Sequence, residues 1–430
     1  MRKIVVAGIM VVALSGSCVS AVERVSLGYI YSTSKSHTEI VTATQGGVNV
    51  VSPTCFDLTM KGHLDVKEIM DEEFVSNMHA QGIKVTPFLS NHWGQKRAQA
   101  ALKNANVLIP EIIEAIEKYD FDGVNVDLEN LKASDRDSLT EFMRKLSDAM
   151  PEEKTVSIAV APNPENTTNT WLAAYDYENL AKHVDYLVVM AYDEHCYGGA
   201  EGPVASIDYV EKSLLSILEV VSKDKIVLGL PMYGRFWEVG APSGGEAIIN
   251  AQIPRIIKQF KVVPNYIEKE GTPMLQVEVK EEQKGPYVNG RYLDAGTYNI
   301  WYENERSIKE KLALINEYDI LGSALWALDN EDASMWNYYK DCLNEITYES
   351  VEEIEIREKK QHVMQYIVIG KVVEIKLLPD EIRNYIAYRY NNLSQKVQSL
   401  SKTNINAFVK YALIPSNSHH YTKLVKKYAC

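Results

Sequence analysis

The chain has 430 residues, of which 46% are hydrophobic and 24% charged, and its formal net charge is −13. This is an ordinary soluble globular composition, which excludes large-scale disorder, and the length permits two or three domains. The charge is uneven: residues 357–430 carry 13 Lys and Arg against 4 Asp and Glu, a net of about +9, leaving 32 against 54, about −22, for residues 1–356. An acidic body of this kind excludes nucleic acid as an expected partner.

The first 21 residues have the features of a cleavable signal peptide. Arg2 and Lys3 precede an apolar stretch at 4–14, and small residues lead to a cleavage site after Ala21. The pattern predicts a secreted protein located in the medium, the cell wall or the periplasm. Lipoprotein anchoring at Cys18 is the alternative, although Leu14 stands one residue off the usual spacing. No later run reaches the roughly 18 apolar residues of a membrane span, so no stable membrane insertion is expected once the signal is removed.

Eight short runs rich in Val, Ile, Leu and Tyr predict β-strands, and amphipathic helical segments such as 98–118 and 139–150 lie between most of them. The runs lie at 25–31, 48–52, 84–89, 123–129, 155–161, 186–192, 226–232 and 320–327. This alternation predicts an α/β fold, a (β/α)8 TIM barrel over residues 22–345. Sites of such barrels lie at the C-terminal ends of the strands, where we expect Glu129, Tyr192, Arg235 and Trp326.

The seventh and eighth predicted strands are too far apart for one helix to connect them. We therefore expect an insertion at about residues 236–298. It should form a small α+β module on the face of the barrel that carries the site. Asn289-Gly290 between two β-prone runs is typical of a two-residue hairpin turn. Residues 346–430 form a basic C-terminal tail of unpredicted fold and function; its charge suits either an anionic wall polymer or simple solvation.

No disulfide framework and no metal site are expected. Once the signal is removed, Cys55, Cys196, Cys342 and Cys430 remain, too few and too dispersed for such a framework. No His and Cys cluster has the spacing of metal ligands. We therefore expect neither a metal nor another cofactor.

The most informative segment is FDGVNVDLEN at 121–130. Asn125, Asp127 and Glu129 stand two residues apart on an otherwise apolar run, and successive side chains of a strand point to opposite faces. The amide and the two carboxyls therefore share one face. Burying such groups is costly unless they are hydrogen-bonded, so this face predicts a functional site. A polar edge strand facing water is the alternative interpretation.

This segment resembles the DxxDxDxE signature of glycoside hydrolase family 18, the chitinase-like hydrolases, with Asn125 where most chitinases carry Asp. With MAYDEH at 190–195, it is more similar to the bacterial spore-cortex-lytic N-acetylglucosaminidase branch than to typical chitinases. Related motifs extend from about residue 25 to 343: GYIY at 28–31, NVVSPTCFDL at 49–58, GLPMYGRFW at 229–237, WYENERSI at 301–308 and ALWALDNED at 324–332. The resemblance implies a secreted glycosidase that hydrolyses β-1,4 bonds of N-acetylglucosamine-containing glycans, with peptidoglycan favoured.

Family 18 enzymes use a substrate-assisted retaining mechanism, in which the sugar's own acetamido oxygen attacks. The resemblance assigns the general acid to Glu129 and the carboxylate that orients the acetamido group to Asp127, and it matches Tyr192 to the tyrosine that contacts the attacking oxygen. Burial and the neighbouring carboxylate should raise the pKa of Glu129. We interpret Asn125 as the donor of a hydrogen bond that keeps Asp127 ionised.

The remaining candidates would bind the substrate, although a structural role is the alternative for each. Trp326 matches the family tryptophan that floors the subsite where the bond breaks, and a sugar face stacks well on such a ring. Asp193 follows Tyr192 and is placed to contact the sugar. Asp122 belongs to the signature but breaks its alternation, so it receives a supporting role. Weaker groove candidates are Tyr29, Asn91, Trp93, Tyr233, Arg235 and Trp301.

Two other functions remain open. A chitinase or chitooligosaccharide hydrolase would use the same mechanism with different groove walls, and the absence of a recognisable N-terminal wall-binding repeat favours it over peptidoglycan. A non-catalytic chitinase-like sugar-binding protein would have lost the acid, and the presence of Glu129 argues against it. We expect a monomer whose partner is its glycan substrate.

Overall fold

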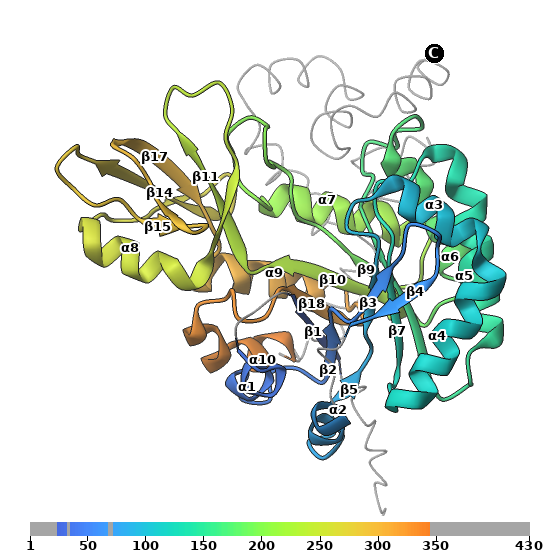
Figure 1. Cartoon of the computed structure of the whole chain (residues 1–430). Coiled ribbons are helices and arrows are strands. Elements are labelled where there is room, and N and C mark those ends of the chain that lie inside the picture. Colours follow the sequence, from blue (N-terminus) through green and yellow to red (C-terminus); the bar gives the residue numbers. More distant parts are fainter. Residues whose placement is uncertain (1–23, 32–34, 68–71, 345–430) are drawn as a thin grey trace, which may run out of the picture.

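The computed structural model describes residues 24–31, 35–67 and 72–344. The predicted signal peptide and basic tail lie outside these residues. The centre of the molecule is a barrel of parallel strands (Figure 1). Its strands are β1 (Val25–Ile30), β2 (Val50–Pro53), β5 (Lys84–Val85) with β6 (Phe88–Ser90), β7 (Gly123–Asp127), β8 (Thr155–Val160), β9 (Tyr186–Val189), β10 (Ile226–Pro231) and β18 (Gly322–Trp326).

The barrel closes through its third strand, which is split into β5 and β6. β5 pairs with β2 and β6 pairs with β7, both in parallel. Across the break, the Thr86 N–H donates to the Val51 carbonyl and the Asn125 N–H donates to the Pro87 carbonyl, each at 2.9 Å. The two segments therefore act as one strand, and the predicted (β/α)8 barrel is confirmed.

Helices surround the barrel, and a short hairpin extends its sheet beside β6. The helix predicted over 98–118 is in fact two helices, α3 (Gln95–Lys103) and α4 (Ala105–Tyr119), which meet at Asn104. At this break the Asn104 side chain donates to the Gly62 carbonyl at 3.1 Å. The helices are α1 (His37–Ala43), α2 (Glu72–His79), α3 (Gln95–Lys103), α4 (Ala105–Tyr119), α5 (Arg136–Ala149), α6 (Tyr177–Leu180), α7 (Ile207–Leu218), α9 (Glu305–Glu317) and α10 (Tyr339–Leu343). The hairpin is β3 (Phe56–Leu58) with β4 (Leu64–Val66), and single 3-10 turns are η1 (Ala133–Asp135), η2 (Trp171–Ala174), η3 (Lys223–Lys225), η4 (Asn250–Gln252) and η5 (Ala333–Asn337).

A second, antiparallel sheet lies between β10 and α9 in the sequence and stands beside the barrel, at the left of Figure 1. We call residues 233–301 the module. Asn289 and Gly290 both have positive φ, 50° and 82°, as a type I′ turn requires, so the predicted hairpin is confirmed. The strand order is β12 (Glu246–Ile249), β11 (Tyr233–Glu238), β17 (Gly296–Trp301), β14 (Thr272–Val279) and β13 (Asn265–Ile267), with α8 (Ile253–Phe260) and the hairpin β15 (Tyr287–Val288) and β16 (Arg291–Tyr292).

The hydrophobic core has two main parts around the barrel sheet. The outer part fills the space between strands and helices and includes Val124 and Val126 of β7. The inner part fills the barrel and includes Leu27, Phe88 and Val188. Within the described residues, none of the helices combines the length and the apolar character needed to cross a bilayer.

Candidate active site

Strand β7 directs two polar residues of the signature into the barrel. Asn125 is fully buried and Asp127 is 5% exposed, while Val124 and Val126 pack outward as the alternation predicts. Glu129 lies two residues beyond the end of β7 and is partly buried. The strand begins at Gly123, where a Cβ atom would lie 1.9 Å from the Thr155 carbonyl oxygen, so only glycine allows this close pairing with β8.

The Asn125 amide is held by two neighbouring strands. Tyr29 of β1 donates its hydroxyl hydrogen to Asn125 Oδ1 at 2.9 Å, and Asn125 Nδ2 donates to Ser157 Oγ of β8 at 2.8 Å. No hydrogen bond joins Asn125 to Asp127. The expectation that this amide keeps Asp127 ionised is therefore wrong, because β1 and β8 place polar partners for Asn125 at its own level of the barrel.

The two carboxyls favour their neutral forms. Burial raises the pKa of Asp127, and no hydrogen-bond partner in the described part of the chain reaches its buried Oδ1 atom. Burial also raises the pKa of Glu129, and the like charges of Asp127 and Asp193 add to that shift. The site therefore holds a proton well above the pH at which an exposed carboxyl releases it.

A second cluster follows strand β9. The Tyr192 ring lies 6.3 Å from the Tyr233 ring, centroid to centroid. Asp193 Oδ1 accepts hydrogen bonds from the Tyr233 hydroxyl at 2.6 Å and from Arg235 Nε and Nη2 at 3.0 and 2.7 Å. The structure thus brings four predicted site residues together. Arg235 does not lie at the end of a barrel strand as expected, since it stands within β11 and reaches the site from the module.

Trp326 ends strand β18 and lies among aromatic side chains. Its ring centroid is 5.2 Å from that of Tyr29, 5.8 Å from Phe88 and 5.7 Å from the exposed Tyr31. The Trp326–Ala327 peptide bond is cis. Tyr29, which is only 2% exposed, therefore supports both Trp326 and Asn125.

Asn91 is not a groove residue. It is fully buried, its Nδ2 donates to the Glu129 carbonyl at 2.8 Å, and its Oδ1 accepts from the Glu129 N–H at 2.9 Å. The expected contact between Asn91 and substrate is corrected accordingly, because both polar ends of the amide are bound to backbone.

The other weak candidates are spread over the molecule. Trp93 is 51% exposed and lies edge-on to Trp171 at 4.9 Å, whereas Trp301 Nε1 donates to Glu201 at 3.1 Å. Asp122 lies before β7, at the opposite end of the strand from Glu129, and accepts from the Val85 N–H at 2.7 Å. Asp122 therefore binds the backbone of β5, and the supporting role expected of it in the site stays a prediction.

Among the residues that contact the signature segment, sequence reasoning missed Ser157 and Tyr175. Ser157 lies opposite Asn125 in the β7–β8 register, and Tyr175 donates its hydroxyl hydrogen to the Leu128 carbonyl at 3.1 Å. Neither belongs to a motif. For Ser157 the signal would have been a polar residue inside an apolar strand, SIAV at 157–160, whereas Tyr175, in WLAAY at 171–175, carries no comparable signal.

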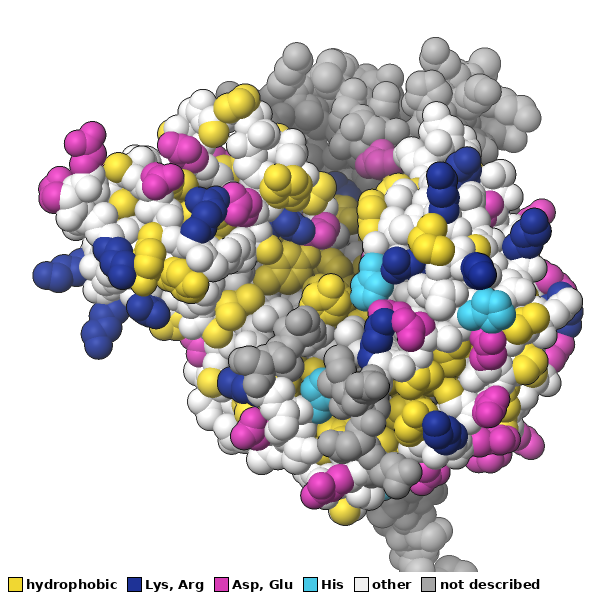
Figure 2. Space-filling model, viewed as in Figure 1, with side chains coloured by type: hydrophobic (Ala, Val, Ile, Leu, Met, Phe, Trp, Pro, Cys, Tyr) yellow, Lys and Arg dark blue, Asp and Glu magenta, His cyan; other side chains and the backbone are white. Residues whose placement is uncertain are grey.

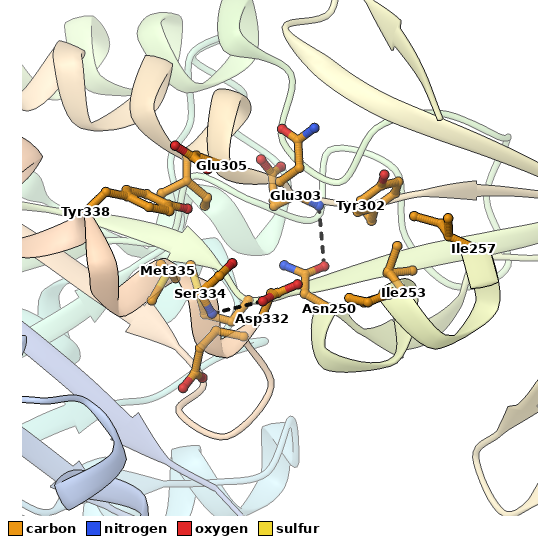
Figure 3. A pocket seen from close by; sticks show the side chains of 15 residues that line it. Asn250, Ile253, Ile257, Tyr302, Glu303, Glu305, Asp332, Ser334, Met335 and Tyr338 are labelled. Atoms are coloured by element: carbon orange, nitrogen blue, oxygen red, sulfur yellow. Dashed lines mark hydrogen bonds between the residues drawn. The ribbon is translucent and has the colours of Figure 1, made fainter. Parts of the chain in front are cut away.

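A hollow lined by apolar side chains separates the module from the barrel in Figure 2. A separate cavity of about 150 Å³ lies where the module meets the turn after β18 (Figure 3). Asn250, Ile253, Tyr302 and Met335 line it, and none of the signature residues does. This cavity is therefore distinct from the carboxyl site. Among residues 24–31, 35–67 and 72–344 there is no group of three or more His, Cys, Asp and Glu arranged to hold a metal ion.

A parallel barrel with two carboxyls at the C-terminal end of its fourth strand places them where barrel enzymes carry their sites, and paired carboxyls are the groups that glycoside hydrolysis uses. The family model for glycosyl hydrolases family 18 matches residues 55–331, and the chain belongs to this family. The resemblance seen in the sequence is thereby confirmed.

The curated relatives include proteins named as glycosylases and proteins named as cortical fragment-lytic enzymes. The chain is 28% identical over 228 residues to the "Uncharacterized glycosylase YvbX" of Bacillus subtilis, covering 53% of this chain and 62% of the relative. It is 28% identical over 244 residues to a "Cortical fragment-lytic enzyme" of the same species, covering 55% and 53%. The chain thus spans a little over half the length of these curated relatives.

The solved structures that share the fold include the following two. A chitinase from Chromobacterium violaceum has a TM-score of 0.66 and 24% identity, covering 75% of this chain and 99% of that one. The spore cortex-lytic enzyme SleL of Bacillus cereus has a TM-score of 0.65 and 21% identity, covering 74% of each chain.

Proposed function

We propose that this protein is a glycosidase that hydrolyses β-1,4 bonds of N-acetylglucosamine-containing glycans, with peptidoglycan as the favoured substrate. The observation that carries the proposal is the pair at the mouth of the barrel: Glu129, whose raised pKa suits a general acid, and Asp127, whose buried Oδ1 has no hydrogen-bond partner among the described residues. The names of the cortex-lytic relatives support peptidoglycan over other glycans.

The proposed reaction is substrate-assisted and retaining. Glu129 gives its proton to the glycosidic oxygen while the acetamido carbonyl oxygen of the substrate attacks the anomeric carbon. The bond between that carbon and the glycosidic oxygen breaks, which releases the leaving sugar with a free hydroxyl group and leaves an oxazolinium-like intermediate. Water then attacks the same carbon and gives its proton to the Glu129 carboxylate, and the acetamido group is restored.

The other side chains receive supporting roles in this reaction. Asp127 accepts the acetamido N–H at its free oxygen and stabilises the positive charge of the intermediate. Tyr192 contacts the acetamido oxygen, and Trp326 forms the floor on which the sugar stacks. Asn125 keeps the layer below Asp127 uncharged. Further substrate contacts are assigned to Asp193, Tyr233 and Arg235, whose hydrogen bonds join the module to the barrel.

The test is product analysis by mass spectrometry after digestion of peptidoglycan and chitin side by side. New reducing N-acetylglucosamine ends in peptidoglycan are expected, and cleavage of chitin alone would establish the chitinase alternative that the fold of the Chromobacterium violaceum chitinase supports. Glu129→Gln should lower turnover about 100- to 10,000-fold while sugar binding changes little, because the amide has no proton to give. Binding without cleavage by the unmodified protein would identify a sugar-binding protein instead.

We further propose that the protein acts outside the cytoplasmic membrane, where peptidoglycan is found. The predicted signal peptide supports this location. Fractionation of cells that express the full chain, followed by detection in wall and medium fractions, tests it, and retention in the cytoplasm would contradict it. The same preparation on a sizing column tests the predicted monomer.

A further inference from the structure

Side chains hold the backbone around Glu129 in place. Three successive carbonyls, at positions 128–130, each accept a hydrogen bond from a side chain of a different segment. β7 has ended at Asp127, so no strand ladder holds this stretch. The bonds run from Tyr175 OH to the Leu128 oxygen at 3.1 Å, from Asn91 Nδ2 to the Glu129 oxygen at 2.8 Å, and from Gln95 Nε2 to the Asn130 oxygen at 2.9 Å.

The bond from Asn91 replaces the missing ladder. The last paired residues of β6 and β7 are Ser90 and Asp127. One residue later, the Asn91 side chain donates to the Glu129 carbonyl and accepts from the Glu129 N–H, which is the pattern of two bonds that a neighbouring strand would supply. Asn91 is fully buried, so water does not compete for these bonds.

The facing loop is fixed from the other side. Asn130 Nδ2 donates to the Trp93 carbonyl at 3.1 Å, and His92, Trp93 and Asn130 all have positive φ, between 46° and 61°. Non-glycine residues in this region are strained, and such residues persist only where the surroundings hold them. The hydrogen bonds between the two loops supply that restraint.

We propose that Asn91, Gln95 and Tyr175 are positioning residues for the general acid, and we call these three residues the Glu129 clamp. Within the described residues, their hydrogen bonds hold the backbone at positions 128–130 and do not reach the Glu129 carboxyl. The proposal rests on the assignment of Glu129 as the acid in the proposed function. A carboxyl two residues past the end of a strand keeps its place beside Asp127 only while its backbone is fixed.

Loosening the Glu129 clamp has a predictable effect on catalysis. A misplaced acid lowers the rate of the chemical step more than the affinity for substrate, so kcat falls and KM changes little. Greater access of water to Glu129 and a larger distance from Asp127 weaken two of the causes that raise its pKa, burial and the like charge of Asp127. The basic limb of the pH profile of kcat/KM then moves to lower pH.

The chain offers two matched pairs of variants for the test. Tyr175→Phe removes the hydroxyl that bonds the Leu128 carbonyl. Tyr177→Phe removes a hydroxyl that bonds the Ala161 carbonyl at 2.7 Å, which lies outside residues 128–130. Gln95→Leu removes the bond to Asn130, and Gln99→Leu, one turn along α3, removes a bond to Asp135 at 2.8 Å. Both substitutions of each pair delete the same chemical group.

Steady-state kinetics on N-acetylchitotetraose from pH 4 to 9 give the readout, after thermal melts have shown that each variant is folded. Tyr175→Phe and Gln95→Leu should each lower kcat about five- to tenfold, with KM within twofold and the basic limb shifted to lower pH. Tyr177→Phe and Gln99→Leu should leave kcat and that limb unchanged. Equal kcat and equal limbs within each pair would overturn the Glu129 clamp.

Failure of the proposed function has a different signature. If the unmodified protein cleaves neither this oligosaccharide nor peptidoglycan, or if Glu129→Gln is as active as the unmodified protein, the acid assignment is wrong. If Glu129→Gln is inactive and the matched pairs do not differ, the acid assignment stands and the Glu129 clamp is rejected.

Discussion

Asp127 and Glu129 make the folded protein a stronger proton binder than the unfolded chain. Burial raises the pKa of each carboxyl, and their like charges oppose the ionisation of both. Wherever the folded state binds more protons than the unfolded state, the free energy of unfolding decreases as pH rises. The carboxyl that serves as an acid in the proposed reaction therefore costs stability at neutral and basic pH.

This cost predicts that Glu129→Gln is more stable than the unmodified protein at pH 8. In the unfolded chain Glu129 releases its proton near its ordinary value of 4.5, and in the folded protein it does so at higher pH. The advantage of the variant should therefore be small at pH 4 and grow to about 1 kcal/mol or more by pH 8. Urea unfolding at both pH values measures it, and a difference that does not grow with pH would contradict the raised pKa.

The next prediction concerns Asn125. Asn125→Asp places a second carboxyl below Asp127, and a like charge raises the pKa of Asp127 further. The proposed reaction needs Asp127 ionised, so the acidic limb of kcat/KM should move to higher pH. Ser157→Ala is the control, since it removes a partner of Asn125 without adding charge and should leave that limb in place. Equal acidic limbs in Asn125→Asp and the unmodified protein would show that position 125 is electrostatically independent of Asp127.

Helix α9 is anchored by an ion pair that is shut off from water. Lys311 Nζ of α9 and Glu303 Oε2, in the turn after β17, are 2.8 Å apart, and their side chains are 0% and 1% exposed. Glu303 Oε1 has no hydrogen-bond partner within the described structure. A buried ion pair adds little net stability over an apolar pair, but removing one partner leaves an uncompensated charge.

Lys311→Met should therefore destabilise the protein by about 3–5 kcal/mol. The double variant Glu303→Leu/Lys311→Met should recover much of this loss, because no charge remains buried. Lys309→Met, which alters a largely exposed pair with Glu305 on the same helix, should cost less than about 0.5 kcal/mol. Urea unfolding of the three variants compares them, and a double variant as unstable as Lys311→Met would mean that packing, not charge, causes the loss.

Periodicity and residue type predict elements well where each element depends on its own sequence. All eight barrel strands lie where apolar runs place them, and Asn289-Gly290 forms its hairpin because two positive φ angles suit those residues. The division of the helix at Asn104 was not predictable. Its partner, the Gly62 carbonyl, lies 42 residues away, and no local pattern reports a contact of that kind.

At the scale of the whole molecule, the module completes the site that the barrel begins. Arg235 of β11 binds Asp193 of the barrel through two nitrogens and donates from Nη1 to the Gly245 carbonyl at 2.7 Å. One guanidinium thus joins the barrel loop at Asp193 to the segment of the module that leads into β12. The proposed substrate groove depends on this junction for its shape.

Arg235→Lys tests the junction. A lysine keeps the charge but cannot bond Asp193 and Gly245 together, because it lacks the planar fork of the guanidinium. KM for a soluble oligosaccharide should rise several-fold with a smaller change in kcat, since the acid pair is untouched. Arg291→Lys is the control, because Arg291 forms an exposed ion pair with Glu246 within the module. It should leave KM unchanged. A fall in kcat without a rise in KM would mean that Arg235 acts in the chemical step.

The signature segment predicted where the carboxyls lie, because strand alternation decides which side chains share a face. It did not predict what Asn125 binds. Tyr29 and Ser157 come from strands 96 residues before it and 32 residues after it, and only the closed barrel brings them to one level. Arg235 was expected on a barrel strand for a related reason: a sequence does not reveal which strands of an insertion turn back toward the site.

The contacts of Asn125 also bear on how such sites diversify. Tyr29 donates to Oδ1, a bond that an aspartate oxygen accepts equally well, and the Ser157 hydroxyl, which now accepts from Nδ2, can rotate and donate instead. Asparagine and aspartate codons differ by a single base. The barrel interior is therefore already suited to either residue, so that a lineage can gain or lose a carboxyl beneath the acid pair in one mutation without first rebuilding its core.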